Sequence, residues 1–508
     1  MLNKAALAAL LLAGSAQAQQ APLSVIDWLT DPPENLPGTV LLEPPVTETG
    51  IQPDIQVSPL EALSQPLGLV SSSVTGLPVH LWQNSDADRL AELITDVPVR
   101  YNPAMQRLLF TLILSEARAP AGSGAEETLL LARIDRLMQL GAADPAQSLV
   151  QLAGPTDTRD RFQRWFDATL LTGDEDRSCT SLIAKPHLSQ DYAAQIFCKA
   201  RRGDWRSAAL TLEAAHALQI LPAEELDVLD RFLSPELFEE AEYLPQPNDP
   251  SPLTFRLFEA IGERLPSAPL PRAFANADLR DVAGWKAQIE AAERLTRIGA
   301  LTPNQLLGLY TERSPAASGA VWDRVSAVQQ FESALDSRDP EKIARALNTV
   351  WTQMRLIGLE VPFAELFAER LSQIELTDPS AEQLRWRILL LSELYETAAL
   401  SVPGQSDENH FLAALAQGDP GRARSPSPLA DAVAQGFAWA APVPSNIETM
   451  LNNDQLGEAI LETMQRFAHG ARGNLVDLTA AIATLRRVGL EDTARRAALN
   501  LLILQDRR

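Results

Sequence analysis

From Asp86 onward, the chain consists of amphipathic helical segments joined by short connections that carry Gly, Pro and Asp. Apolar residues recur in them at three- and four-residue spacing, and no run of alternating strand residues interrupts the series. The low aromatic content, 6%, and the dominance of Ala and Leu also favour helix over strand. The sequence therefore predicts an all-α fold, with helices at 89–94, 105–117, 126–140, 161–171, 175–184, 191–200, 205–220, 223–233, 285–298, 322–335, 343–356, 363–374, 382–398, 475–488 and 491–504.

Part of this helical sequence is repeated. Residues 136–147 match residues 294–305, and each copy places a Gly and an Ala directly after a helical segment, at Gly141 and Gly299. A Gly in the left-handed conformation followed by an apolar residue ends a helix with a Schellman contact. Repeated helix–Gly–helix units are typical of stacked helical hairpins, so we expect an α-solenoid with a long extended N-terminal arm.

Residues 197–205, followed by Ala208 and Ala209, resemble the turn region of tetratricopeptide-like repeats, which often place Gly-Asp between two helices. The whole chain is similar to uncharacterised exported helical-repeat proteins of alphaproteobacteria, with a proline-rich head and a helical body. This resemblance implies helix-hairpin stacking, and it implies no catalytic residue.

Residues 1–18 have the pattern of a secretory signal peptide. A short basic start is followed by an apolar run, and a small-residue cleavage site ends at Ala18. No Cys follows the apolar run, so a lipid anchor is not expected. The sequence predicts cleavage after Ala18 and export into a bacterial periplasm, without membrane insertion.

Residues 19–79 are predicted to form a proline-rich, acidic and extended arm that contains neither Lys nor Arg. Apolar patches interrupt it at Trp28 and between Leu67 and Val70. Segments of this kind rarely keep such anchors unless something binds them, so we expect these residues to dock, either on this chain's own helices or on a partner. Behind the arm, the sequence divides into the following predicted parts: helical-repeat arrays at 80–245 and 246–400, a loop-rich connection at 401–430 and a C-terminal helical cap at 431–508.

The two cysteines, Cys179 and Cys198, lie in the predicted helices 175–184 and 191–200. Their midpoint falls at the connection between these helices, so an antiparallel hairpin brings the two thiols opposite each other. In an oxidising compartment such a pair usually forms a disulfide. A redox-active pair is the alternative, although the Cys-x-x-Cys spacing is absent.

No motif in the chain identifies a reaction. The five His form no helical zinc pair, and His187 and His216 are expected to be solvent-facing or packed residues. The acidic runs 174–176 and 239–242 are interpreted as a helix N-terminus and a solvated face. The sequence therefore predicts no catalytic residue, no metal ligand and no cofactor, and the formal charge of −23 argues against nucleic acid as a partner.

The tryptophans leave one alternative open. Those within helical segments are expected to pack between neighbouring hairpins, while a groove that binds a peptide or glycan through one or two of them remains the alternative. They are Trp205, Trp285, Trp322, Trp351 and Trp386.

These features favour a periplasmic, non-enzymatic scaffold, adaptor or chaperone that binds a protein partner of the cell envelope. Solenoids supply curved surfaces suited to that task. A protein of cell-wall metabolism that binds glycan strands is the alternative, although we find no Glu-Ser block of the kind lytic transglycosylases carry. A structural envelope protein is the third hypothesis.

Overall fold

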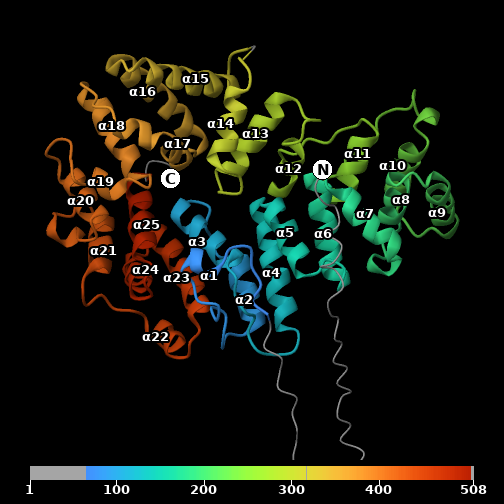
Figure 1. Cartoon of the computed structure of the whole chain (residues 1–508), viewed down its shortest axis with the longest axis horizontal. Coiled ribbons are helices and arrows are strands. Elements are labelled where there is room, and N and C mark those ends of the chain that lie inside the picture. The colour runs from blue at the N-terminus through green and yellow to red at the C-terminus, as the bar shows by residue number, and fades with distance from the viewer. Residues whose placement is uncertain (1–64, 316, 505–508) are drawn as a thin grey trace, which may run out of the picture. The chain divides into compact units, whose positions relative to one another are not determined.

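The computed structural model describes residues 65–315 and 317–504 (Figure 1). Within them the chain is all-α, as predicted: it forms the helices α1 to α25 and no strand. In the first half these are α1 (Ser72–Thr75), α2 (Ala87–Asp96), α3 (Pro103–Leu114), α4 (Ala125–Leu140), α5 (Ala143–Ala153), α6 (Arg159–Thr172), α7 (Glu175–Ala184), α8 (Tyr192–Arg201), α9 (Trp205–Leu218), α10 (Ala223–Leu233), α11 (Pro252–Ala260) and α12 (Ala275–Asp278). In the second half they are α13 (Trp285–Thr296), α14 (Pro303–Thr311), α15 (Val321–Ser337), α16 (Pro340–Ile357), α17 (Glu360–Ser372), α18 (Pro379–Leu390), α19 (Tyr395–Ala398), α20 (Asp407–Ala416), α21 (Pro428–Phe437), α22 (Ser445–Asn452), α23 (Leu456–Ala471), α24 (Leu475–Arg487) and α25 (Glu491–Ile503). Short 3₁₀ turns lie between them at η2 (Pro186–Leu188), η3 (Pro235–Leu237), η4 (Arg272–Phe274) and η5 (Pro420–Arg422).

The predicted helix stops are confirmed. Gly141 has a φ of 87°, and the N–H of Ala142 reaches back to the carbonyl of Leu137 at 2.8 Å. Gly299 has a φ of 84°, and Ala300 donates to the carbonyl of Leu295 at 3.0 Å. Both are Schellman ends, which satisfy carbonyls that the helix itself leaves unpaired.

The repeat also carries an arginine with the same role in both copies. Arg136 on α4 donates to the carbonyl oxygens of Thr95, at 2.7 Å, and Val97. Its counterpart Arg294 on α13 donates to the carbonyls of Ser267, at 2.9 Å, and Leu270. Each arginine thus joins its helix to a segment that lies earlier in the chain. The two copies of the repeat therefore share this arginine as well as the Gly.

Two predicted helix boundaries are wrong, and one helix was not predicted. The helix expected over 105–117 ends at Leu114, because the chain at 67–70 hydrogen-bonds to the backbone beyond it. The helix expected over 382–398 is broken after Leu390, where the Ser392 hydroxyl binds the backbone of both Leu389 and Leu394. The segment 401–430, predicted to be loop-rich, contains the largely buried helix α20.

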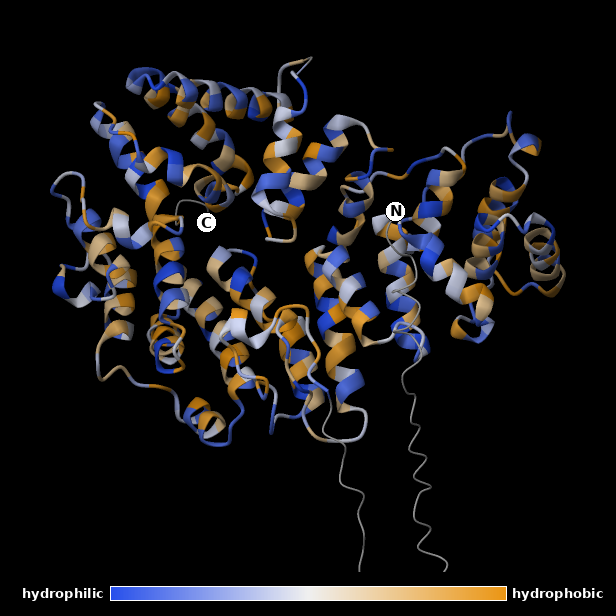
Figure 2. Ribbon diagram, viewed as in Figure 1, coloured by the Kyte–Doolittle hydropathy of each residue, from blue (hydrophilic) through white to orange (hydrophobic). Residues whose placement is uncertain are grey.

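Consecutive helices pack against each other, with α4 on α5, α5 on α6, α7 on α8 and α8 on α9. Figure 2 shows hydrophobic and hydrophilic residues interspersed along these helices, as expected of helices with one face turned to a core. One contiguous cluster of buried apolar side chains extends from Leu77 to Leu504, and a small second cluster consists of Ala275, Ala291 and Leu295. The predicted arrays and the C-terminal cap therefore share one hydrophobic core.

The last helices of this core pack against the first ones. In Figure 1, α23 and α25 lie beside α2 and α3, and the contacts between these helices agree with the picture. The side chain of Asn102 donates to the carbonyl of Ala497 at 2.9 Å, and the N–H of Gly457 donates to the carbonyl of Leu81 at 2.9 Å. A Cβ on Gly457 would lie 2.4 Å from the buried ring of Trp82, so glycine is needed for this close approach. The sequence predicts a cap at the end of an array. It does not predict that α23 and α25 pack against α2 and α3.

Candidate functional site

The predicted docking residues Leu67 and Val70 lie against this chain's own backbone. Leu67 pairs with Ala117 through two hydrogen bonds of 3.0 and 3.3 Å, and Val70 accepts from the N–H of Glu116 at 2.8 Å. Gly68 lies so close that an added Cβ would be 2.2 Å from the carbonyl oxygen of Ser115. Of the two alternatives for this patch, docking on the same chain is therefore the one observed. Trp28 lies outside the described residues, as do the predicted signal peptide and the rest of the predicted arm up to residue 64.

A buried arginine holds this segment in place. Arg133 on α4 is 2% exposed, and it donates to the carbonyls of Ile113 at 2.7 Å, Leu67 at 3.0 Å and Ser115 at 3.0 Å. No carboxylate partner of Arg133 occurs in the part of the chain that the structure describes, and burial lowers the pKa of its guanidinium to about 10. Residues 65–79, which the sequence analysis assigned to the extended arm, therefore belong to the folded body and include α1.

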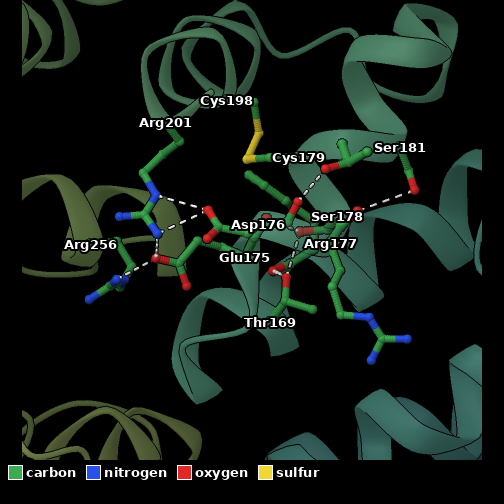
Figure 3. The surroundings of a disulfide bond; sticks show 12 residues. Thr169, Glu175, Asp176, Arg177, Ser178, Cys179, Ser181, Cys198, Arg201 and Arg256 are labelled. Atoms are coloured by element: carbon green, nitrogen blue, oxygen red, sulfur yellow. Dashed lines mark hydrogen bonds and ion pairs between the residues drawn. A yellow bond between two sulfur atoms is a disulfide. The ribbon is translucent and has the colours of Figure 1, made fainter. Parts of the chain in front are cut away.

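The predicted disulfide is present. Cys179 on α7 and Cys198 on α8 are bonded, with their Cα atoms 4.8 Å apart, and both side chains are fully buried (Figure 3). The helix bounds, Glu175–Ala184 and Tyr192–Arg201, agree with those predicted to within one residue. The chain contains no other cysteine, so the hairpin is the single place where a disulfide can act on the fold.

The acidic run before the disulfide lies at the N-terminus of α7, as predicted, although one member is not solvated. Glu175 is 1% exposed and contacts Arg256 of α11 at 2.6 Å and Arg201 of α8 at 3.3 Å (Figure 3). Arg201 also reaches Asp176 at 3.0 Å. These ion pairs join α7, α8 and α11 beside the disulfide, and the cluster is interpreted as structural because it links three helices.

An apolar surface accessible to a partner lies around α21, α24 and the loop 438–444. A groove of about 660 Å³ is lined mainly by small and apolar side chains of these elements. Trp439 in the loop is fully exposed, and Val476 on α24 is 79% exposed. Exposed large apolar side chains at the edge of an apolar groove are typical of an interaction site.

Trp439 was not predicted from the sequence, because only tryptophans within predicted helical segments were singled out. Its position in a loop of Ala and Pro was the available signal, since such a loop offers no helix face on which the ring can pack. The tryptophans predicted to pack do so in two clear cases, Trp351 and Trp386, which are buried. Trp285 and Trp322 pair with each other at 5.0 Å, and Trp205 is half-exposed.

The histidines and the second acidic run are as expected. His187 is exposed, and His216 is 44% exposed with its Nε2 atom 3.0 Å from Asp230. The run 239–242 is exposed. Within residues 65–315 and 317–504, no cluster of three or more His, Cys, Asp or Glu side chains has the spacing to hold a metal ion.

One carboxyl group should make the stability depend on pH. Burial raises the pKa of Asp167 on α6 to about 7, although Gln163 donates to it at 3.1 Å. This pKa lies above the value in the unfolded chain. Between about pH 4 and pH 7 the folded state therefore keeps a proton that the unfolded state has already released. The contribution of Asp167 to the free energy of unfolding therefore decreases as the pH rises through that window.

We expect Asp167→Asn to stabilise the protein by about 1–2 kcal/mol at pH 8 and by clearly less at pH 5, because the neutral amide removes the cost of a partly buried charge. Urea denaturation at the two pH values measures the difference. Asp160→Asn, at an exposed position on the same helix, is the control. An equal effect of Asp167→Asn at pH 5 and pH 8 would contradict the prediction.

No family model, curated protein or solved structure matches this chain. None of the helices described in residues 65–315 and 317–504 combines the length and apolarity that crossing a membrane requires.

Proposed function

We propose that this chain is a periplasmic, non-enzymatic helical scaffold, adaptor or chaperone that binds a protein partner of the cell envelope. The observation that carries the proposal is the apolar groove beside α21 and α24, with the exposed Val476 in its lining and the exposed Trp439 in the loop between the lining residues Ala438 and Ala440. Tryptophan is enriched among the residues that dominate protein interfaces, since it buries a large area with few rotatable bonds. The pattern of residues 1–18 and the disulfide support the periplasmic part of the proposal.

The surroundings of the groove favour an apolar partner segment. Its lining is mostly alanine, proline, leucine and valine, with Asp431 as the charged residue. Because few lining groups can form hydrogen bonds, affinity must come from burying apolar area, at roughly 25 cal/mol per Å² before ordering costs. A partner segment with one or two large apolar side chains fits this surface better than a glycan strand, which would leave its hydroxyl groups without partners.

The test compares partner capture by matched variants of the exported protein. We expect Trp439→Ala to reduce recovery of the partner from periplasmic extract at least tenfold, as measured by quantitative mass spectrometry. Tyr243→Ala removes a similarly exposed aromatic ring, 84% exposed and remote in sequence from the groove, and should leave recovery unchanged.

Two outcomes would overturn the proposal. Equal recovery with Trp439→Ala and Tyr243→Ala would show that the groove is not the binding surface. Binding to purified peptidoglycan strands alone, with no protein recovered, would favour the cell-wall hypothesis. Circular dichroism of each variant separates loss of binding from loss of fold.

A further inference from the structure

A pocket of about 460 Å³ opens where four separate segments meet: the turn before α3, the start of η4, the end of α13 and the end of α16. Each segment contributes one arginine to its lining, namely Arg100, Arg272, Arg297 and Arg355, and no Asp or Glu lines it. The chain as a whole has a formal charge of −23. A concentration of guanidinium groups in such an acidic protein needs its own physical explanation.

The charges of these arginines act on one another. Arg272 is partly buried, and its pKa is lowered by burial and by the neighbouring charges of Arg294, Arg297 and Arg100. Among the described residues, no carboxylate forms an ion pair with Arg100, Arg272 or Arg297. Like charges held close together destabilise the folded state, and an anion bound among them would relieve that repulsion.

The hydrogen-bonding groups of Arg272 are only partly used. Its Nη1 atom donates to the carbonyl of Gln139 at 3.2 Å, while its buried Nε–H has no partner in the part of the chain that the structure describes. A buried donor without an acceptor destabilises the folded state, so it is rarely retained without a reason. An oxyanion supplies the kind of acceptor that a guanidinium fork binds through two parallel hydrogen bonds.

Compensation of helix dipoles explains only part of this cluster. Arg355 lies in the last turn of α16 and Arg297 directly follows α13, where a positive charge offsets the carbonyl ends of the helix. Arg100 precedes a helix N-terminus, at which a positive charge is unfavourable. The dipole argument therefore does not account for bringing Arg100 to the same pocket.

We propose that this pocket is a binding site for a small organic anion that carries at least two negative charges as carboxylate or phosphate groups. The volume is within the range of small-molecule sites and exceeds what a single inorganic ion fills. Tyr101, Ile298 and Leu356 line the same pocket and offer apolar contact to the carbon part of such a molecule. The site is independent of the proposed partner groove, since the two share no residue.

Isothermal titration of the mature protein with citrate and with pyrophosphate tests the proposal, with sodium chloride used to hold the ionic strength constant. We expect at least one of the two probes to bind with a stoichiometry of one, and binding to weaken as salt is raised. Binding of citrate alone indicates a carboxylate ligand, and binding of pyrophosphate alone indicates a phosphate ligand. Either result supports the site.

Matched variants locate the binding. Arg297→Gln and Arg100→Gln, both at exposed positions, should each weaken binding at least tenfold while the melting temperature of the free protein is unchanged or raised, because a repulsive charge is removed. Arg206→Gln, on the exposed face of α9, removes the same charge elsewhere and should have no effect. No binding of either probe, or equal weakening by Arg206→Gln, would overturn the proposal.

Discussion

Arg133→Met is expected to lower the free energy of unfolding by about 3 kcal/mol or more, one of the two largest effects we expect from changing side chains of this protein. The guanidinium is buried and satisfies three carbonyl oxygens, those of Leu67, Ile113 and Ser115. Methionine fills much of the same volume but leaves the carbonyls of Ile113 and Ser115 without the guanidinium donor, at a cost of about 1–3 kcal/mol for each one that stays buried, while the carbonyl of Leu67 keeps the N–H of Ala117. Urea denaturation followed by circular dichroism measures the loss.

Two further variants identify the cause. Arg206→Met makes the same change at an exposed position and should change stability by less than about 0.5 kcal/mol. Gly68→Ala leaves Arg133 in place but introduces a Cβ 2.2 Å from the carbonyl oxygen of Ser115, so it should displace residues 67–70 and destabilise in the same direction. If Arg133→Met were no more destabilising than Arg206→Met, the buried contacts would not contribute to stability.

These contacts also change what truncation of the N-terminal region should do. If residues 19–79 formed only an extended arm, as the sequence predicts, removing residues 20–79 would leave the helical body intact. The structure shows that Leu67 supplies one of the three acceptors of Arg133, so that deletion removes part of the folded body. A truncation that preserves the body has to end before Gln65.

What the sequence could predict depended on how local the determining interactions are. The helices around Cys179 and Cys198 were placed to within one residue, because apolar spacing, capping residues and the connection all lie within the same short segment. The ends at Gly141 and Gly299 followed from one residue type and its left-handed conformation. The end of α3 could not be predicted, because it is set by pairing with residues 67–70, far away along the chain.

The candidate sites show the same limit. The pocket brings together arginines at positions 100, 272, 297 and 355, and no pattern along the sequence relates these positions. The helix α20 was not predicted, because the sequence on either side is rich in Gly, Pro and Ser and favoured a loop, although the ten residues of α20 are suited to a helix. Packing between segments that are distant in the sequence determines both the arginine pocket and the position of α20, and local sequence patterns do not encode such packing.

The disulfide is the other position with a large expected effect. Replacing both cysteines, as Cys179→Ala with Cys198→Ala, should lower the free energy of unfolding of this hairpin by about 3 kcal/mol, because the bridge closes a loop across a sequence separation of 19 residues and so restricts the unfolded chain. The double variant is preferred to either single change, since a single change leaves a reactive buried thiol. Urea denaturation of the oxidised protein and of the variant gives the difference.

Without the disulfide, unfolding should begin in the hairpin of α7 and α8 and not occur evenly throughout the core. Arg201 still joins α8 to Asp176 and Glu175 without the disulfide, but ion pairs that involve exposed groups contribute little, so they cannot replace the covalent constraint. Hydrogen exchange should therefore show the earliest loss of protection in α7 and α8, with α24 and α25 unchanged. Dithiothreitol should lower the stability of the wild-type protein to near that of the double variant and leave the variant unaffected. Unchanged wild-type stability after thiol titration has shown full reduction would mean that packing of the buried hairpin, and not the bridge, determines its stability.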